Sequence, residues 1–357
     1  MRQTKRVLVV DDSAFMRRLI SEMVESRPEF LVVGTARDGA DALAKVRTLR
    51  PDIVTLDIEM PAVDGLTALS MIMAEMPRPV VMLSAAGSLE NNSLTIRALE
   101  LGAIEFVRKP SGPVSIDLAS VRAELLRALD AASLVRVSQT QPTLRMERSE
   151  APRPPEKRQS VTAHSAVVIA ASTGGPKALS EVVAHFPETL DAAVLVVQHM
   201  PGDFLASLAQ RLSQLGTFPV AVALHDEPVM TGRVYLAPGD RHMTVVLKGR
   251  RPIIRIDRGP AICGVRPSAD PLFTSASGVF KENLVGVVLT GMGRDGSEGL
   301  RAVRAAGGAS IVQDRASSII YGMPRSALAT AGADRVVAPR LVGMAATELL
   351  SSRRAVA

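Results

Sequence analysis

Short apolar runs rich in valine, isoleucine and leucine alternate with helix-patterned segments along most of the chain, and this alternation strongly limits the possible folds. In the first third of the sequence, each of five such runs is followed by a helical pattern after a short connection. The expected strands are 5–10, 31–35, 53–56, 80–83 and 104–107, and the expected helices lie near 14–26, 38–49, 64–76, 89–101 and 115–133. Consecutive strand–helix units predict a doubly wound α/β domain, in which helices cover both faces of a parallel sheet.

The same alternation returns in the second half of the chain. We expect strands at 166–170, 193–198, 219–223, 284–290 and 309–313, helices near 176–185, 203–214, 270–281, 296–306 and 341–352, and a hairpin-like insertion over about 233–257. Between the halves, residues 134–163 are polar, proline-rich and aperiodic, which indicates a flexible linker. The chain is therefore predicted to contain two doubly wound parallel-sheet domains, 1–133 and 164–357, joined by a Pro-rich linker.

Composition excludes several classes of protein. The chain has 357 residues, of which 47% are hydrophobic and 22% charged, so we expect folded domains. The single cysteine, Cys263, excludes an internal disulfide and fits a reducing compartment. We find no signal-peptide pattern and no apolar run long enough to cross a bilayer, so we expect a cytoplasmic protein without membrane insertion.

The net charge of +6 resides mainly in the second half, which suits an acidic partner surface. Nucleic acid is the weaker candidate for that partner, because the sequence has no dense run of lysine and arginine and only 3% aromatic residues. We therefore expect no nucleic-acid binding.

Polar residues cluster where the strands of the first half end. Asp11 and Asp12 follow the first strand, Asp57 ends the third, Ser84 ends the fourth and Lys109 follows the fifth. These ends meet at one crevice of a doubly wound sheet, where three carboxylates repel one another unless a cation such as Mg²⁺ lies among them. The alternative is that each aspartate is a helix N-cap, as Asp12 could be. That alternative explains single residues but not the whole cluster.

The first 133 residues resemble the flavodoxin-like receiver domain of two-component response regulators, whose pattern is an acidic pair, a phosphoacceptor aspartate, a Ser/Thr and Lys-Pro. The resemblance implies that a histidine kinase acts as phosphodonor and that Asp57 is phosphorylated. It also implies that Asp12, Asp57 and the backbone carbonyl of Glu59 hold Mg²⁺, with Asp11 acting through water.

The same resemblance assigns roles to three further residues. Ser84 and Lys109 are expected to contact the phosphoryl group, and Phe106 occupies the position of an aromatic switch whose rotamer reports phosphorylation. The turn after the third strand, with Met-Pro at 60–61 and Asp-Gly at 64–65, also matches the receiver pattern.

A serine, a histidine and an aspartate follow three expected strands of the second half. Ser172 lies on a glycine-rich turn from a strand into a helix, and His199 and Asp295 follow two other strands. A serine needs a base to take its proton and a third group to orient the base, so this combination fits a hydrolase. Two alternatives remain: Ser172 and Asp295 could each simply cap the helix that follows.

The remaining histidines lack such a setting and are interpreted as surface or structural residues: His164, His185, His225 and His242. A zinc site at His199 is not expected, because no second histidine or cysteine lies at ligand spacing. The turn after Ser172 is not a P-loop either, since no Lys-Ser/Thr follows its glycines.

The second half resembles, over almost its whole length, the catalytic domain of bacterial chemotaxis protein-glutamate methylesterases. The matching motifs are Ala-Ser-Thr-Gly-Gly-Pro at 171–176, Gln-His-Met-Pro at 198–201, Tyr-Leu-Ala-Pro-Gly at 235–239, Arg-Pro-Ser-Ala-Asp at 266–270, Leu-Thr-Gly-Met-Gly at 289–293 and Tyr-Gly-Met-Pro at 321–324. The resemblance implies that Ser172 is the nucleophile, His199 the base and Asp295 the orienting acid, without a cofactor. The backbone N–H groups of Thr173 and Met292 are expected to support the oxyanion.

The implied reaction is phosphorylation-activated hydrolysis of glutamate methyl esters, and deamidation of specific glutamines, on methyl-accepting chemoreceptors. Before phosphorylation of Asp57, the receiver is expected to cover the catalytic face. A phospho-regulated protein-binding module and an esterase paralogue in a non-chemotactic pathway are the alternatives. The role of Arg294 is open: its guanidinium could pair with Asp295 or face an acidic substrate.

Overall fold

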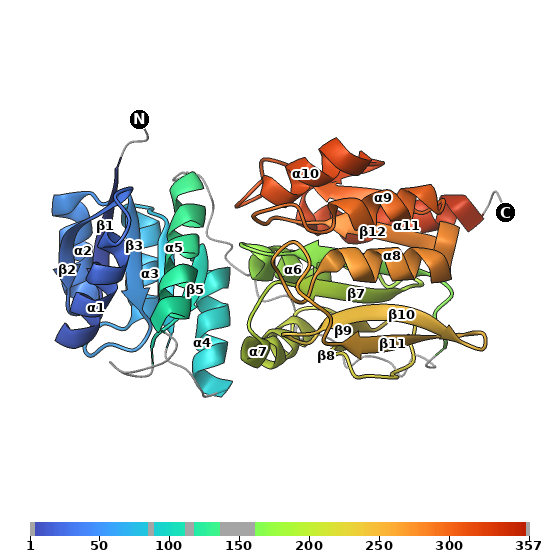
Figure 1. Ribbon diagram of the computed structural model, residues 1–357, viewed down its shortest axis with the longest axis horizontal. Helices are drawn as coiled ribbons and strands as arrows, with labels where there is room; N and C mark the ends of the chain where they lie inside the picture. Colours follow the sequence, from blue (N-terminus) through green and yellow to red (C-terminus); the bar gives the residue numbers. More distant parts are fainter. Residues whose placement is uncertain (1–3, 85–88, 111–117, 136–160, 355–357) are drawn as a thin grey trace. The chain divides into compact units, whose positions relative to one another are not determined.

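The computed structural model describes residues 4–84, 89–110, 118–135 and 161–354. Figure 1 follows the chain through two units, Met1–Glu147 and Arg148–Ala357, and each is described here by itself. Most of the predicted linker, residues 136–160, lies outside the described residues. The predicted class is confirmed, because both units are α/β structures with a parallel main sheet.

The first unit contains a parallel sheet with the strand order β2-β1-β3-β4-β5. Its strands are β1 (Lys5–Val10), β2 (Phe30–Ala36), β3 (Ile53–Asp57), β4 (Val80–Ser84) and β5 (Glu105–Arg108). Its helices are α1 (Ala14–Glu25), α2 (Gly39–Leu49), α3 (Gly65–Glu75), α4 (Leu89–Glu100) and α5 (Leu118–Leu134). The strand order reverses between β1 and β3, and ligands of open α/β sheets bind at such a reversal.

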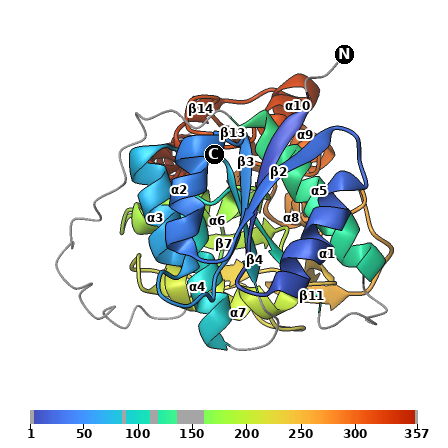
Figure 2. The same ribbon diagram turned by 90° about the vertical axis from the view of Figure 1, so that its left-hand side faces the viewer.

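Helices cover both faces of this sheet. Helices α1 and α5 pack against each other on one face, and α2, α3 and α4 form the other layer (Figure 2). At the end of β3, α3 approaches the sheet so closely that a Cβ on Gly65 would lie 2.0 Å from the carbonyl oxygen of Asp57. Only glycine fits there, so the Asp-Gly turn positions α3 beside β3.

The second unit contains a larger parallel sheet with the order β14-β13-β12-β6-β7-β9-β8. The strands are β6 (Ala166–Ala171), β7 (Ala193–Gln198), β8 (Val220–Val222), β9 (Val234–Leu236), β12 (Leu284–Val288), β13 (Ala309–Gln313) and β14 (Arg335–Val337). A separate antiparallel hairpin is formed by β10 (His242–Lys248) and β11 (Arg251–Asp257).

The helices of the second unit also form two layers. They are α6 (Gly175–Ala184), α7 (Gly202–Ser213), α8 (Ala269–Phe280), α9 (Ser297–Ala305), α10 (Gly322–Ala331) and α11 (Val342–Arg354), with short 3₁₀ turns η1 (Lys281–Asn283) and η2 (Pro339–Leu341). Helix α9 packs against α8 and α10, whereas α6 packs against α7 and α11. Within the described residues, no helix is both long enough and apolar enough to span a membrane.

Three elements of the second unit differ from the sequence prediction. The run 234–236 was assigned to the insertion, but as β9 it joins the main sheet between β7 and β8. Helix α10 and strand β14 were not predicted. A three-residue strand carries almost no periodicity, and the Gly-Met-Pro start of α10 resembles a turn. The proline is nevertheless tolerated, because N–H groups in a first helical turn need no intrahelical partner.

The centre of the large sheet is dry and apolar. Every residue of β6 and β7 is buried, as expected for central strands covered on both faces. Strand β6 lies between β12 and β7, so the chain segments that follow these three adjacent strands emerge at one sheet edge. The fold thus gathers the loops that carry Ser172, His199 and Asp295.

Candidate functional site

An acidic pocket lies at the carboxyl end of the receiver-like sheet. Asp11 and Asp57 are buried, Asp12 is exposed, and carboxylate oxygens of the three lie within 4.8 Å of one another. Asp12 and Glu59 also line an open cleft of about 340 Å³. The N-cap alternative for Asp12 is wrong, because Ser13 caps α1 by accepting a hydrogen bond from the N–H of Met16.

A half-buried lysine joins two of these carboxylates. Lys109 Nζ lies 2.8 Å from Asp57 Oδ2 and 3.1 Å from Asp11 Oδ2. Burial raises the pKa of Asp57 to about 6, although the ammonium of Lys109 opposes the rise. One ammonium cannot balance three carboxylates, so an all-oxygen donor set with residual negative charge remains. That donor set fits Mg²⁺.

The hydroxyl of Ser84 pairs with a residue that was not predicted. Ser84 Oγ lies 2.9 Å from Thr95 Oγ1 of α4, and the two hydroxyls form a buried hydrogen bond. Phe106, the expected aromatic switch, is buried in β5. The helical pattern around Thr95 does not single out this residue in the sequence, because its contact with Ser84 depends on the packing of α4 against β4.

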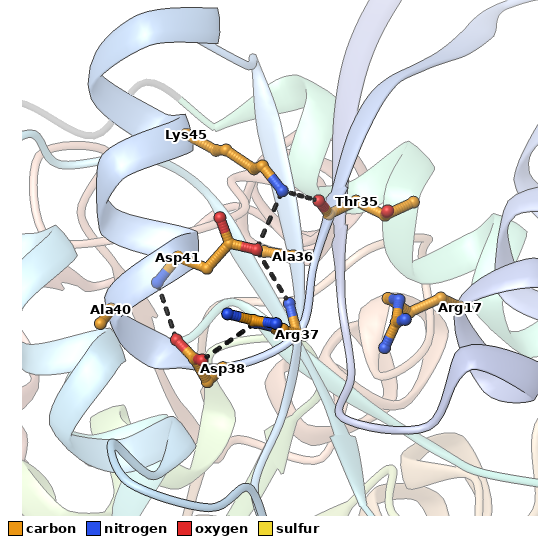
Figure 3. A pocket seen from close by; sticks show the side chains of 8 residues that line it. All are labelled: Arg17, Thr35, Ala36, Arg37, Asp38, Ala40, Asp41 and Lys45. Carbon is orange, nitrogen blue, oxygen red and sulfur yellow. Dashed lines mark hydrogen bonds and ion pairs between the residues drawn. The ribbon is translucent and has the colours of Figure 1, made fainter.

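Arg17 supports the backbone of the acidic pair. Its Nη1 donates to the carbonyl oxygens of both Asp11 and Asp12 at 2.9 Å. Arg17 also lines a charged cleft of about 520 Å³ (Figure 3). Within that cleft Lys45 is paired with Asp41 at 2.9 Å. Arg37 lies 3.8 Å from Asp38, and Arg17 is engaged by backbone carbonyl oxygens, so we assign the cleft no ligand.

Ser172 occupies the turn between β6 and α6, and its side chain is half-buried. Its N–H donates to the carbonyl oxygen of Thr290 at 3.0 Å. The helix-cap alternative is wrong, because the N-cap of α6 is Gly174 and no side chain caps this helix. Within the described residues, the Ser172 hydroxyl has no hydrogen-bond partner, so it is free to meet a substrate.

His199 and Asp295 are in direct contact, whereas no hydrogen bond joins Ser172 to His199 within the described residues. His199 Nε2 lies 2.7 Å from Asp295 Oδ2, and the two side chains are 13% and 3% exposed. Because a carboxylate oxygen only accepts hydrogen bonds, the proton of the neutral ring is assigned to Nε2, which donates to Asp295 Oδ2. Nδ1 is then the ring nitrogen that can take a proton from Ser172. The ring is therefore turned relative to the serine-protease triad, in which Nδ1 faces the aspartate.

The carboxylate of Asp295 lies at the start of α8. It accepts hydrogen bonds from Ser268 Oγ at 2.6 Å and from the N–H of Ala269 at 2.7 Å. Burial alone would raise the pKa of Asp295, but these bonds and His199 together hold it below its ordinary value. The predicted cap alternative is wrong, because the N-cap of α9 is Gly296, without a side-chain cap.

Gln198, which we did not single out from the sequence, joins the backbones of Ser172 and His199 through its side-chain amide. Its Nε2 donates to the carbonyl oxygens of Ser172 and His199, each at 3.0 Å. A Cβ on Gly175 would lie only 1.9 Å from Gln198 Oε1, so the second glycine of the turn makes room for this amide. The signal was present in the sequence, because Gln198 opens the Gln-His-Met-Pro motif.

Three further site candidates, Thr173, Met292 and Arg294, lie within three positions of Ser172 or Asp295 in the sequence. Thr173 is buried, and its carbonyl oxygen accepts a hydrogen bond from Thr290 Oγ1 at 3.0 Å. Met292 is 48% exposed. Arg294 is exposed and makes no ion pair within the described part of the chain, so its pairing with Asp295 is not supported.

Cys263 also lies near the carboxylate of Asp295. Its Sγ lies within 4.8 Å of carboxylate oxygens of Asp270 and Asp295. Both oxygens of Asp295 already accept hydrogen bonds from α8 or its N-cap residue, and they retain little lone-pair capacity for an ion. We therefore do not assign a metal to this group.

Comparison with known proteins places this geometry in a family. Residues 167–345, half of the chain, match the CheB methylesterase family. The chain belongs to the CheB methylesterase family. Residues 7–119 match the response regulator receiver domain, so a receiver precedes the CheB methylesterase domain. The chain is thus a receiver-regulated esterase, and the alternatives of a binding module or a non-chemotactic paralogue are not favoured.

Relatives of similar length carry the name protein-glutamate methylesterase/protein-glutamine glutaminase. One from Symbiobacterium thermophilum is 47% identical over 348 residues, which are 94% of this chain and 93% of that protein. One from Pyrococcus abyssi is 45% identical over 333 residues, which are 93% of this chain and 90% of that protein. The crystal structure of the Thermotoga maritima CheB methylesterase catalytic domain is 35% identical, with a TM-score of 0.51, and covers 53% of this chain and 100% of that one.

Proposed function

We propose that the second unit hydrolyses glutamate methyl esters, and deamidates specific glutamines, on the cytoplasmic domains of chemoreceptors. Ser172 acts as nucleophile, His199 as general base and Asp295 as the group that orients the base. The 2.7 Å contact between His199 and Asp295, in loops that flank the strand directly before Ser172, is the observation that carries this proposal. The names of the relatives supply the glutamate ester and glutamine groups, and the family resemblance supplies the chemoreceptor.

The order of proton transfers in the proposed reaction follows from which ring nitrogen of His199 carries the proton. His199 Nδ1 takes the proton of Ser172, whose oxygen attacks the ester carbonyl carbon. Negative charge then develops on the carbonyl oxygen, where the N–H groups of Thr173 and Met292 are proposed to donate. Collapse of the tetrahedral species expels methanol, protonated by His199, and leaves an acyl-Ser172. Water, activated by the same base, releases glutamate.

The receiver is proposed to control this reaction through phosphorylation of Asp57 by a histidine kinase. Asp12, Asp57 and the carbonyl of Glu59 would hold Mg²⁺, with Asp11 acting through water. The ion would supply positive charge to the phosphoryl oxygens. Lys109 already contacts the carboxylate that accepts the phosphoryl group. For Ser84 to bind a phosphoryl oxygen, its hydroxyl must turn from Thr95, which couples the pocket to α4.

Magnesium binding is expected to weaken below pH 6. The pKa of Asp57 is raised to about 6, so its carboxylate is ionised above that pH and protonated below it. Because a protonated carboxyl is a poor Mg²⁺ ligand, affinity should fall by roughly tenfold per pH unit below pH 6. Calorimetric titration of the full chain measures this, with Asp57→Asn as the control that lacks the titration. Unchanged affinity from pH 7.5 to 5 would exclude Asp57 as a ligand.

The proposed function as a whole is tested by methanol release. The full chain, with Mg²⁺ and a small-molecule phosphodonor, is incubated with receptors carrying radiolabelled glutamate methyl esters. Labelled methanol should appear at a rate proportional to enzyme. No release above the buffer rate from any methylated receptor would refute the proposed substrate.

A further inference from the structure

The hydroxyl of Ser268 does not make the helix-capping hydrogen bond that its position would normally give it. It is the N-cap residue of α8 and is 0% exposed, yet its side chain makes no capping hydrogen bond. An N-cap serine usually accepts a hydrogen bond from an N–H group in the first turn of its helix. Ser268 Oγ instead donates to Asp295 Oδ1 at 2.6 Å. The hydroxyl therefore donates to the carboxylate of Asp295 and does not cap the helix.

Both oxygens of Asp295 are held from the same segment. Oδ1 accepts from Ser268 Oγ and, at 3.3 Å, from the N–H of Asp270. Oδ2 accepts from the N–H of Ala269 and faces His199. A carboxylate held on one oxygen can rotate about its Cβ–Cγ bond, whereas donors on both oxygens fix its plane. The short bond from Ser268 is the better of the two contacts on Oδ1.

A buried histidine in turn holds Ser268. His242 is the first residue of β10 and is 3% exposed. The N–H of Ser268 donates to His242 Nδ1 at 3.2 Å, so this nitrogen carries no proton. The proton resides on Nε2, which donates to the carbonyl oxygen of Pro260 at 3.0 Å. Ser268 is thereby fixed at its backbone as well as at its hydroxyl.

We propose that Ser268 is a positioning residue for the esterase reaction, and that His242 holds it in place. The chain of hydrogen bonds runs from His242 through Ser268 to Asp295, and from there to His199. This inference rests on the function proposed above, because these hydrogen bonds can affect the reaction only if His199 acts as the base.

Removing the hydroxyl should change both the orientation and the charge of the carboxylate. In Ser268→Ala, Oδ1 retains only the long contact from Asp270, so Asp295 orients His199 less well and kcat falls. The carboxylate also loses a hydrogen bond that disperses its negative charge, so it attracts a positive charge on the neighbouring imidazole more strongly. The acidic limb of the pH profile should therefore move to higher pH. Besides His199, the titratable groups near Asp295 are Asp270 and Cys263.

The test compares Ser268→Ala with Ser277→Ala in the full chain, by methanol release from methylated receptor. Ser277 is a matched control, because it is a buried serine of α8 whose Oγ, within the described residues, donates only to the carbonyl oxygen of Thr274. We expect kcat of Ser268→Ala to fall by about tenfold, with KM unchanged and a shifted acidic limb. Ser277→Ala should keep the parent values.

A double-mutant cycle tests the part played by His242. His242→Phe fills the same space without ring nitrogens and should lower kcat by less than Ser268→Ala. The double variant should be no worse than Ser268→Ala alone, because both changes act through one carboxylate. If the loss of kcat in the double variant equals the product of the two single losses, the role of His242 would be overturned.

The other outcomes separate this inference from the proposed function. An active parent with Ser268→Ala matching Ser277→Ala in kcat and pH profile would overturn the positioning role alone. A parent chain that releases no methanol would overturn the proposed function, and this inference with it.

Discussion

Replacement of Ser172 by alanine is expected to abolish methanol release while the protein stays folded. The hydroxyl of Ser172 makes no hydrogen bond within the described residues, so its removal costs the fold little. The reaction, in contrast, loses the atom that attacks the ester. Loss of a triad nucleophile in serine hydrolases lowers kcat by about 10⁴-fold or more. The rate is measured as labelled methanol released from methylated receptor, and the melting temperature serves as the check on folding.

A serine elsewhere in the unit controls for nonspecific effects of the substitution. Ser213 lies at the end of α7, where its hydroxyl bonds the backbone of Val220. Ser213→Ala should lose some stability and keep its activity. Substantial methanol release by folded Ser172→Ala would remove Ser172 from the mechanism, whatever the behaviour of the control.

Replacement of Asp295 by asparagine is expected to have the second largest effect. The amide has one accepting oxygen, whereas the carboxylate accepts from His199, Ser268 and the start of α8. An asparagine NH₂ that faces His199 would donate to Nε2 and thereby move the ring proton to Nδ1, where it blocks transfer from Ser172. The corresponding change in serine proteases lowers kcat by about 10⁴-fold.

Asp334→Asn is a matched control for that change. Asp334 also has a lowered pKa: burial opposes the shift, but hydrogen bonds from the N–H and hydroxyl of Ser310 outweigh it. It precedes β14, at the opposite end of the strands from the catalytic loops. Asp334→Asn should therefore lower the melting temperature without lowering kcat. Equal activity of Asp295→Asn and the parent would contradict the assigned role of Asp295.

The site residues that could be predicted from the sequence are those that directly follow the expected strands. Continuous apolar runs identify central parallel strands, and the polar residue after each run marks the reactive edge. This reasoning led to Asp57, Ser172, His199 and Asp295. Sequence alone could not place β12 directly beside β6, because more than a hundred residues separate them, so the contact between Asp295 and His199 is visible only in the structure.

The residues that were missed act through tertiary contacts. Ser268 reaches Asp295 from the start of another helix, and His242 reaches Ser268 from the hairpin. Thr95 reaches Ser84 across the receiver core. None of these partners lies close in sequence to the group it supports, and no local periodicity encodes such pairs. The Arg-Pro-Ser-Ala-Asp motif did contain Ser268, but its spacing indicated a helix start and not a catalytic contact.

The central claim is that phosphorylation at Asp57 controls hydrolysis at Ser172. Its most direct test is the rate of methanol release from methylated receptor by the full chain, with Mg²⁺, in the presence and absence of acetyl phosphate. The phosphodonor should raise the rate of the parent by roughly tenfold or more, leave Asp57→Asn at its basal rate and produce no release from Ser172→Ala. An equal rise in Asp57→Asn and the parent, or none in either, would contradict the account.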